Sequence, residues 1–275
     1  MSARTGKSAR FDAAVAARVL AQVRRRRPLV HNIANQVAME TTCDMLLAVS
    51  ASPAAVVAPE EAAEFARGAD ALAANIGTLT RERLQALRGA AGAMRAAGRP
   101  WVLDPVGLGG SAHRGAAARE LLALRPTVLR ANAGEVALLA GADASVLRGV
   151  DAAIPADSMA STAADLARDA GVVVAMTGEV DVVASRTGTT RLVGGHELMA
   201  LVTGMGCGAT ALIAAALAVE PDPRIASLAA LAWLAVAGEA AAERCDGPGS
   251  FRVALLDALH GLDAANLAAR AWSTA

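Results

Sequence analysis

Apolar residues recur along the chain in two patterns, one typical of helices and the other of buried strands. Stretches with 3.6-residue spacing predict helices, and short apolar runs between turn residues predict strands. We expect helices at 11–23, 36–49, 59–67, 81–97, 114–124, 135–140, 157–170, 207–219, 224–244 and 251–269. We expect strands at 54–58, 71–76, 101–103, 128–129, 172–176, 180–185 and 191–193. This repeated alternation is typical of an α/β fold with a mostly parallel sheet covered by helices on both faces.

The length of the chain suits one α/β domain. It has 275 residues, and neither a Pro/Ser-rich linker nor an internal repeat divides it. A chain of this size can bury a core without disulfides or metals. We therefore predict a single domain over residues 28–275, preceded by an N-terminal tail and helix at 1–27.

The charge balance excludes a general attraction to polyanions. Lys+Arg and Asp+Glu number 26 each, so no positive field is available for nucleic acid or an anionic membrane. With three Phe, three Trp and no Tyr, a stacking surface for single strands is not expected either. The four arginines at 24–27 are most simply a solvated helix end.

The chain is expected to be soluble and cytoplasmic. The apolar stretch at 204–219 is rich in Ala and Gly and ends at Glu220-Pro221, which favours a buried helix over a membrane span. Asp12 and Arg18 interrupt the apolar run that a signal peptide would need. Three cysteines lie far apart without a CxxC pair, which argues against a disulfide framework or a zinc site.

The segment Thr5-Gly6-Lys7-Ser8 ends like a phosphate-binding P-loop. The preceding glycine and strand of that motif are missing, and Lys7 is the only lysine. A P-loop kinase is therefore not expected.

Two junctions that follow predicted strands combine acidic residues with phosphate-binding chemistry. Asp104 precedes the Gly-rich segment 105–110, and a carboxylate beside such a loop suits Mg²⁺ and phosphate. At the second junction, Arg130 can bind phosphate oxygens and Glu135 lies where a helix begins. Taken singly, an Asp-capped turn and an N-capped helix explain these two junctions equally well.

Two further junctions contain glycines and hydroxyl groups. Residues 177–181, which begin with Thr177, could contact a nucleotide or could be a plain hairpin turn. Residues 203–210 open a long apolar helix, where the backbone N–H groups around Gly204 and Gly206 would form an anion hole. Cys207 lies at that helix start, where the helix dipole is expected to favour a thiolate; a small buried residue is the alternative.

In this order along the chain, the four motifs resemble those of the hydroxyethylthiazole kinase family, within the ribokinase-like superfamily. Further matching segments lie at 31–35, 51–53, 75–79, 247–251 and 255–259, so that the resemblance runs from about residue 28 to about residue 263. It implies a three-layer α/β/α ribokinase-like fold. It also implies phosphorylation of 4-methyl-5-(2-hydroxyethyl)thiazole with Mg-ATP in thiamine salvage, and a homotrimer with sites between subunits.

The resemblance also assigns roles to residues of this chain. Asn35, the Gly204 backbone and the position of Ala55 would contact the thiazole alcohol. Arg130 and Thr177 would bind ATP, and Asp104 and Glu135 would organise Mg²⁺. Cys207 occupies the position where many relatives in the superfamily have an Asp as general base; together with Gly204 and Gly206 it would form the catalytic helix start.

The chain departs from the family pattern mainly among residues expected near the acceptor. The family usually has Thr at Ala34, Asn at Asp44, Gly at Ser50 and Met at Ala55, where the smaller side chain would enlarge the pocket. A kinase for a related alcohol such as hydroxymethylpyrimidine is therefore an alternative. A non-catalytic binder with the same fold and the dehydratase branch of the superfamily are two others.

Overall fold

Eight strands form one sheet in the order β2-β1-β3-β4-β5-β6-β7-β8 in the computed structural model, which describes residues 11–143 and 155–269. Neighbouring strands from β2 to β6 are parallel, and β7 and β8 extend the sheet with antiparallel pairings. The strands are β1 (Leu29–Ile33), β2 (Ser52–Ala54), β3 (Ala71–Asn75), β4 (Trp101–Asp104), β5 (Val128–Asn132), β6 (Val173–Thr177), β7 (Val180–Ser185) and β8 (Gly188–Val193). The predicted α/β class with a mostly parallel sheet is confirmed.

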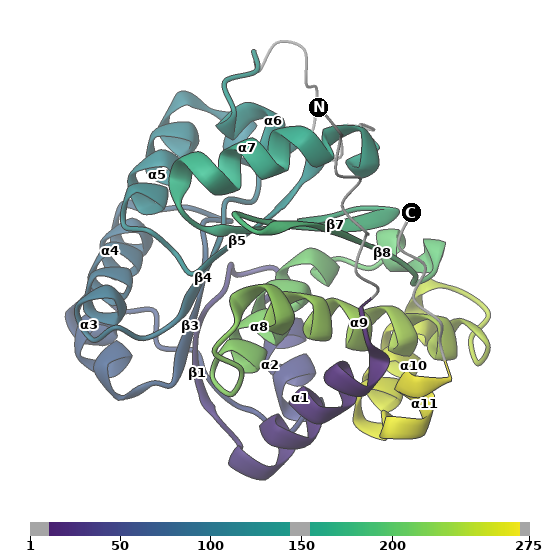
Figure 1. The fold of residues 1–275 in the computed structure, drawn as a ribbon. Helices are drawn as coiled ribbons and strands as arrows, with labels where there is room; N and C mark the ends of the chain where they lie inside the picture. Colours follow the sequence, from purple (N-terminus) through teal and green to yellow (C-terminus); the bar gives the residue numbers. More distant parts are fainter. Residues whose placement is uncertain (1–10, 144–154, 270–275) are drawn as a thin grey trace.

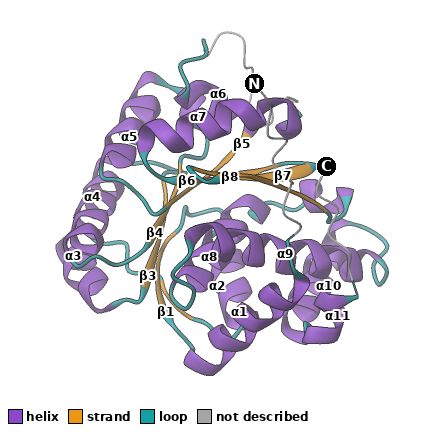
Figure 2. Ribbon diagram, viewed as in Figure 1, coloured by secondary structure: helices purple, strands orange, loops and turns teal. Residues whose placement is uncertain are grey.

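Helices cover both faces of this sheet (Figures 1 and 2). One face carries α3 (Pro59–Gly68), α4 (Arg81–Ala96), α5 (Ala112–Ala123), α6 (Ala133–Leu139) and α7 (Ala160–Ala170). The other carries α1 (Ala13–Arg26), α2 (Met39–Ala48), α8 (Met205–Leu217), α9 (Pro223–Ala242), α10 (Pro248–Gly261) and α11 (Ala264–Ala268). Each layer encloses its own apolar core, with Trp101 fully buried in the first and Trp233 in the second.

The N-terminal helix is packed into the second layer. Its apolar stripe, which includes Val19 and Val23, is fully buried, and the Trp233 indole N–H of α9 donates to the Ala16 carbonyl at 3.0 Å. The placement of residues 1–27 outside the main domain stays a prediction. The P-loop-like segment at 5–8 lies outside the described residues.

Helix α9 passes the length and composition test for a membrane span, yet it belongs to the core. Over its most apolar window, 78% of the residues are buried inside the fold. The predicted buried helix at 207–219 is also confirmed, because α8 packs against α2, α9 and the sheet.

Several predicted bounds differ from the structure by about three residues, among them the start of α2, the end of β5 and the start of β8, and two elements differ more. The helix expected at 251–269 is two helices, because α10 ends at Gly261 and α11 begins at Ala264. The guanidinium of Arg24 on α1 donates to the carbonyls of His260 and Leu262, so a distant residue completes the end of α10. The strand expected at 54–58 is β2, which ends at Ala54 because its parallel pairing with β1 covers only three residues.

Candidate active site

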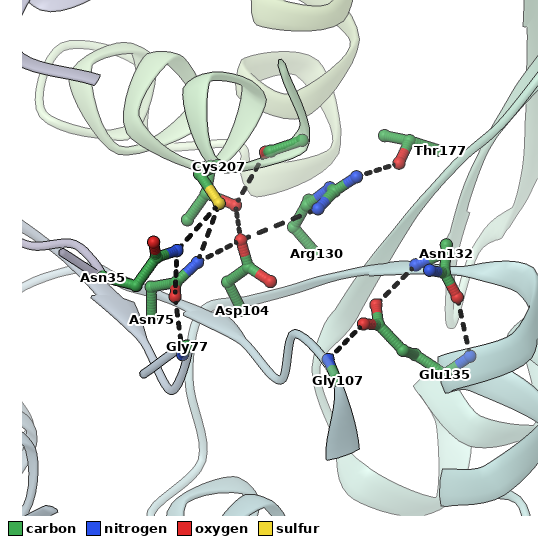
Figure 3. A network of polar contacts seen from close by, with 12 residues as sticks. Asn35, Asn75, Gly77, Asp104, Gly107, Arg130, Asn132, Glu135, Thr177 and Cys207 are labelled. Carbon is green, nitrogen blue, oxygen red and sulfur yellow. Dashed lines mark hydrogen bonds and ion pairs between the residues drawn. The ribbon is translucent and has the colours of Figure 1, made fainter. Parts of the chain in front are cut away.

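Polar side chains gather at the carboxyl ends of the parallel strands (Figure 3). Asn75 and Asp104 are register partners at the ends of β3 and β4, and Asn132 and Thr177 are partners at the ends of β5 and β6. Ligands of open α/β sheets bind outside this edge, next to helix N-termini. The structure therefore unites residues that lie up to about 170 positions apart in the sequence, Asn35 and Cys207 included.

Asp104 is the fully buried centre of this network. Its Oδ2 accepts hydrogen bonds from the Thr210 hydroxyl at 2.8 Å and from Asn75 Nδ2 at 2.7 Å, and the Arg130 guanidinium lies 3.6 Å away. Its Oδ1 is buried and has no partner among the described residues. An unpartnered carboxylate oxygen inside a protein is costly, so this atom is a candidate ligand for a cation.

Arg130 lies against the first turn of α8. It is 8% exposed, and its Nη2 donates to the Thr177 hydroxyl. A Cβ added to Gly206 would lie 2.4 Å from Arg130 Nη1, so the guanidinium occupies the space that any side chain at that position would need. The absence of a side chain at Gly206 thus allows a cationic fork beside a helix N-terminus.

The start of α8 has the geometry of an anion site. Gly204 is its N-cap with φ +93°, a left-handed conformation that favours glycine. The N–H groups of the first turn have no intrahelical acceptors, and the helix dipole adds partial positive charge there. Gly204 also packs against α2, because an added Cβ would lie 3.3 Å from Ala38 Cβ.

Cys207 is a neutral thiol, contrary to the prediction of a dipole-stabilised thiolate. Burial raises the pKa of Cys207 to about 12, and the negative charge of Asp104 adds to this effect. Arg130 and the amide N–H groups of Asn35 and Asn75, each 3.3 Å from Sγ, oppose the pKa rise without cancelling it. The helix dipole is a weaker influence here than desolvation and a nearby carboxylate.

Glu135 is held by two backbone donors. Its Oε1 accepts from Gly107 N at 2.9 Å and its Oε2 from Asn132 N at 2.9 Å, which completes a capping box at the start of α6. Burial raises the pKa of Glu135, and the negative charge of Asp104 raises it further. The ionised forms of these two carboxylates repel each other, and a divalent cation bound between them would offset that repulsion.

Asn35 lies beside Cys207 at the acceptor end of the network. Its Oδ1 accepts from the backbone N–H groups of Val37 and Ala38, both at 3.0 Å, just before α2. Its Nδ2 points to Asn75 Oδ1 at 3.1 Å and to Cys207 Sγ. The side chain is 6% exposed, and both ends of its amide have protein partners.

The four departures from the family pattern lie at different places. Ala55 directly follows β2 and is exposed, and among the described residues it does not join the polar network. Ala34 is buried, with its carbonyl bonded to the Arg83 guanidinium. Asp44 is half-buried on α2. Ser50 follows the C-terminal end of α2, the opposite end from Asn35, with φ +66°. Ser50 is thus separated by the length of α2 from Asn35, and the expectation that the departures gather around the acceptor stays a prediction.

Sequence reasoning missed the roles of Asn75, Thr210 and Asn132, although all three lie inside motifs that it singled out. Asn75 and Thr210 bond to Asp104, and Asn132 caps the helix that carries Glu135. The position of Asn75 at the end of a strand, two residues before Gly77, was the available signal. Only the fold shows that it meets Asp104.

The arrangement combines a cationic fork and a helix N-terminus with two buried carboxylates. The first pair suits a polyanion, and the second suits a hard cation with oxygen ligands. Among the described residues, no three His, Cys, Asp or Glu side chains form a cluster that could hold a metal by themselves. A cation held here would therefore draw its remaining ligands from water and from a bound anion, as is usual for Mg²⁺ with phosphates.

Comparison with known proteins connects this site to one family. The family model described as the hydroxyethylthiazole kinase family matches residues 20–265. A hydroxyethylthiazole kinase from Granulibacter bethesdensis is 48% identical over 249 residues, which cover 90% of this chain and 90% of that protein. The structure of a hydroxyethylthiazole kinase from Pyrococcus horikoshii superposes with a TM-score of 0.86 at 37% identity, covering 94% of this chain and 97% of that one.

A more distant structure shares the fold alone. The ADP complex of Bacillus subtilis pyridoxal kinase superposes with a TM-score of 0.59 at 18% identity, covering 76% of this chain and 90% of that one. The ribokinase-like architecture implied by the sequence resemblance is confirmed by these similarities.

Proposed function

The chain belongs to the hydroxyethylthiazole kinase family, and from this premise we propose that it phosphorylates the hydroxyethyl group of 4-methyl-5-(2-hydroxyethyl)thiazole with ATP. The observation that carries the proposal is the juxtaposition of Arg130, the α8 N-terminus and buried Asp104 at one edge of the sheet. Such a set is suited to phosphoryl transfer, in which positioning and electrostatic stabilisation supply most of the catalysis. Family membership favours this kinase over both a non-catalytic binder and a dehydratase.

The nucleotide end of the site is assigned to Arg130 and Thr177. The Arg130 guanidinium directs donors toward the α8 start, and Thr177 holds one of its nitrogens. In this role Arg130 binds phosphate oxygens, while the N–H groups around Gly204 and Gly206 stabilise the charge that develops on the transferred group. The low exposure of Arg130 strengthens these interactions, because little water competes with them.

The metal end is assigned to Asp104 and Glu135. The residues fit Mg²⁺, because Asp104 Oδ1 is buried without a partner among the described residues and the pKa of Glu135 is raised by burial and by that same carboxylate. Asp104 would hold the ion directly, and Glu135 directly or through water. When bound, Mg²⁺ neutralises charge on the phosphates of ATP.

The acceptor end is assigned to Asn35, Gly204 and the region of Ala55. The hydroxyl to be phosphorylated would lie near Cys207, and a thiol with a pKa of about 12 is a poor general base at neutral pH. We therefore assign Cys207 a positioning contact. The orientation of the hydroxyl in the anion hole, together with the metal, supplies the catalysis.

The test is an assay of ADP release with Mg-ATP and purified protein. The thiazole alcohol is offered in one series and hydroxymethylpyrimidine in another, because the small Ala55 side chain leaves room for other rings. We expect thiazole-dependent turnover, and Arg130→Ala and Gly204→Val are each expected to lower kcat/KM by about 100-fold or more. Arg130→Ala removes a donor, whereas Gly204→Val keeps its N–H but strains a residue with φ +93° and crowds Ala38, which displaces the donors of the helix start. Arg88→Ala is the matched control, because Arg88 is paired with Glu120 on the outer surface of α4 and α5.

Turnover with the pyrimidine alone would overturn the acceptor assignment. Absence of acceptor-dependent ADP release, with ATP binding intact, would overturn the kinase assignment. Equal losses in Arg88→Ala and Arg130→Ala would show that removing any arginine is harmful, and the nucleotide role of Arg130 would then have no support.

The proposal includes a homotrimer with sites between subunits. Val37 and Leu201 are large apolar residues that are 64% and 66% exposed, and each lies within three residues of a site residue, Asn35 or Gly204. Exposed apolar side chains beside a site are typical of a surface that a second chain covers. Leu47 on α2 and Val253 on α10 are also exposed.

Light scattering coupled to size-exclusion chromatography tests the assembly. The wild-type protein is expected to be a trimer, and Val37→Glu with Leu201→Glu is expected to give a monomer with little activity. Val193→Glu on β8, at a residue 39% exposed, is the control that should stay trimeric. A monomeric wild-type protein with full turnover would contradict the assembly.

A cytoplasmic location completes the proposal. Cys43, Cys207 and Cys245 are all free thiols, as expected in a reducing compartment. Fractionation of cells that express the chain should recover the activity with the soluble cytoplasmic proteins.

A further inference from the structure

Asn75 is a buried amide at the end of β3 whose polar atoms all have protein partners. It is 2% exposed. Its Nδ2 lies 2.7 Å from Asp104 Oδ2 and 3.3 Å from Cys207 Sγ, and its Oδ1 lies 3.1 Å from Asn35 Nδ2 and 2.8 Å from Gly77 N (Figure 3). Among the described residues, no other side chain of the network hydrogen-bonds to both Asp104 and Asn35.

The chemistry of these partners permits one orientation of the amide. A carboxylate oxygen only accepts, so the NH₂ group of Asn75 faces Asp104. The Gly77 N–H only donates, so the carbonyl oxygen of Asn75 faces it. Asn35 must then present its own NH₂ group to that oxygen. Two hydrogen bonds, from Asn75 to Asp104 and from Asn35 to Asn75, thus connect the carboxylate with the Asn35 amide.

The remaining contacts leave Asn35 little freedom. Its carbonyl oxygen is held by the N–H groups of Val37 and Ala38. On its other side, a Cβ added to Gly77 would lie 2.6 Å from Asn35 Cβ, so the backbone of residue 77 packs directly against it. Asn75 therefore provides the shortest hydrogen-bonded connection between Asp104 and Asn35, alongside the contact of Asn35 with Cys207 on α8.

We propose that Asn75 is a positioning residue that couples the acceptor site to the metal-binding carboxylate. The inference rests on the proposed function, in which Asn35 contacts the thiazole alcohol and Asp104 holds the cation of Mg-ATP. Occupation of one end fixes the Asn75 amide, and the other end then binds with less loss of freedom. Such coupling is reciprocal for binding, so Mg-nucleotide and the acceptor each increase the affinity for the other by the same factor.

Calorimetry on the full chain measures this factor. The thiazole alcohol is titrated into protein alone and into protein saturated with Mg²⁺ and a β,γ-methylene analogue of ATP, which cannot transfer its phosphate. For the wild type we expect the Kd to fall by about fivefold or more on saturation, the lower end of typical couplings. For Asn75→Leu, which keeps the shape without the polar atoms, we expect a ratio near one.

Asn32→Leu is the matched control. Asn32 is another buried asparagine, 1% exposed on the adjacent strand β1, and it donates to Thr42 Oγ1 and Cys43 Sγ of α2. Its substitution removes a buried amide of the same kind without touching Asp104 or Asn35. A merely structural role for Asn75 would lower the melting temperature in both variants, whereas only Asn75→Leu is expected to lose the coupling ratio.

Gly77→Ala is a second variant that keeps Asn75 and displaces Asn35. Gly77→Ala tests the same connection if Asn75→Leu fails to fold. In this variant too, the ratio of the acceptor Kd without and with Mg-nucleotide should fall toward one.

The outcomes separate this inference from the function on which it rests. A wild type that turns over the thiazole but shows equal acceptor Kd with and without Mg-nucleotide overturns the coupling and leaves the kinase intact. Retention of the wild-type ratio in Asn75→Leu, or in Gly77→Ala when Asn75→Leu does not fold, also overturns it. The coupling is also overturned if Asn32→Leu loses the Kd ratio as fully as Asn75→Leu does. A wild type that neither binds nor phosphorylates the thiazole in any state overturns the proposed function itself.

Discussion

Cys207 shows at the scale of one residue how a local signal is outweighed by its surroundings. The start of a helix stabilises a thiolate by a modest amount, and the sequence contains that signal. Burial and the neighbouring carboxylate of Asp104 act in the opposite direction and raise the pKa of Cys207 to about 12. Neither influence can be deduced from sequence, because Asp104 lies about 100 residues away and meets Cys207 only in the fold.

Alkylation of Cys207 by iodoacetamide should therefore be slow, and its rate should keep rising with pH up to pH 10 without levelling off. With a pKa of about 12 and a reference value near 8.5, the thiolate fraction at pH 8 is about one in 10⁴. Because folding raises the pKa, the thiolate form is suppressed throughout the pH range from 7 to 10. The rate is expected to increase about tenfold per pH unit over that range.

The measurement is peptide mass spectrometry of labelled protein, with the unfolded chain as reference and Cys207→Ser to identify the peptide. Half-maximal labelling of the folded protein near pH 8 would show that the pKa of Cys207 is lowered, and Cys207 would then be a candidate general base.

At the scale of an element, the end of α2 contains a strained backbone conformation at Ser50 that glycine would adopt without strain. Ser50 has φ +66° and its N–H bonds to the Leu47 carbonyl at 2.9 Å, so the helix ends with a left-handed residue. An L-residue with a side chain is strained in that conformation, whereas glycine is not. The family preference for glycine at this position, inferred from the sequence resemblance, thus has a structural explanation unrelated to the acceptor.

Ser50→Gly is expected to increase the free energy of unfolding by about 0.5–1 kcal/mol, because relief of strain outweighs the added freedom of the unfolded chain. Urea unfolding measures the change. Ser50→Ala is the control, since it keeps the strain and should give no gain. A lower stability in Ser50→Gly, or a changed KM for the acceptor, would contradict this explanation.

Elements were predicted well where their own residues determine them. The periodicity of 81–97 and the strand at 180–185 agree with α4 and β7 to within about one residue. The predictions were wrong where a distant partner sets the end. Arg24 of α1 binds the last carbonyls of α10, and the pairing with β1 sets the length of β2. Such partners are fixed by tertiary packing, which local periodicity does not record.

The same division holds for the site. Asp104, Arg130, Thr177 and Cys207 were predicted as members of one site because the order of their motifs along the chain resembles that of the family. The amide network around Asn75 was not, because its hydrogen bonds depend on register between β3 and β4.

At the scale of the whole molecule, one sheet separates two apolar cores. Trp101 lies in the core on the α3–α7 face, and Trp233 in the core beneath α9. Both cores contain residues of β1 and of each strand from β3 to β7, so neither core is expected to lose its packing while the other keeps its own. We expect the described part of the chain to unfold as one unit.

Two variants with a single tryptophan test this expectation. Each retains either Trp101 or Trp233, with the other and Trp272 replaced by phenylalanine. In each variant the fluorescence midpoint in urea should coincide with the midpoint by circular dichroism, since packing and backbone are lost together. Separate midpoints for the variant that retains Trp101, with coincident ones for Trp233, would show that the α3–α7 face melts independently.

The two glycines that accommodate functional side chains also bear on how this protein can evolve. At position 77 the space of a side chain is taken by Asn35, and at position 206 it is taken by Arg130. A mutation at either glycine displaces a functional group, so few substitutions there can survive selection for activity. Ala55, exposed after β2, carries no such restriction. Substitutions at position 55 are therefore expected to be tolerated more readily than substitutions at positions 77 and 206.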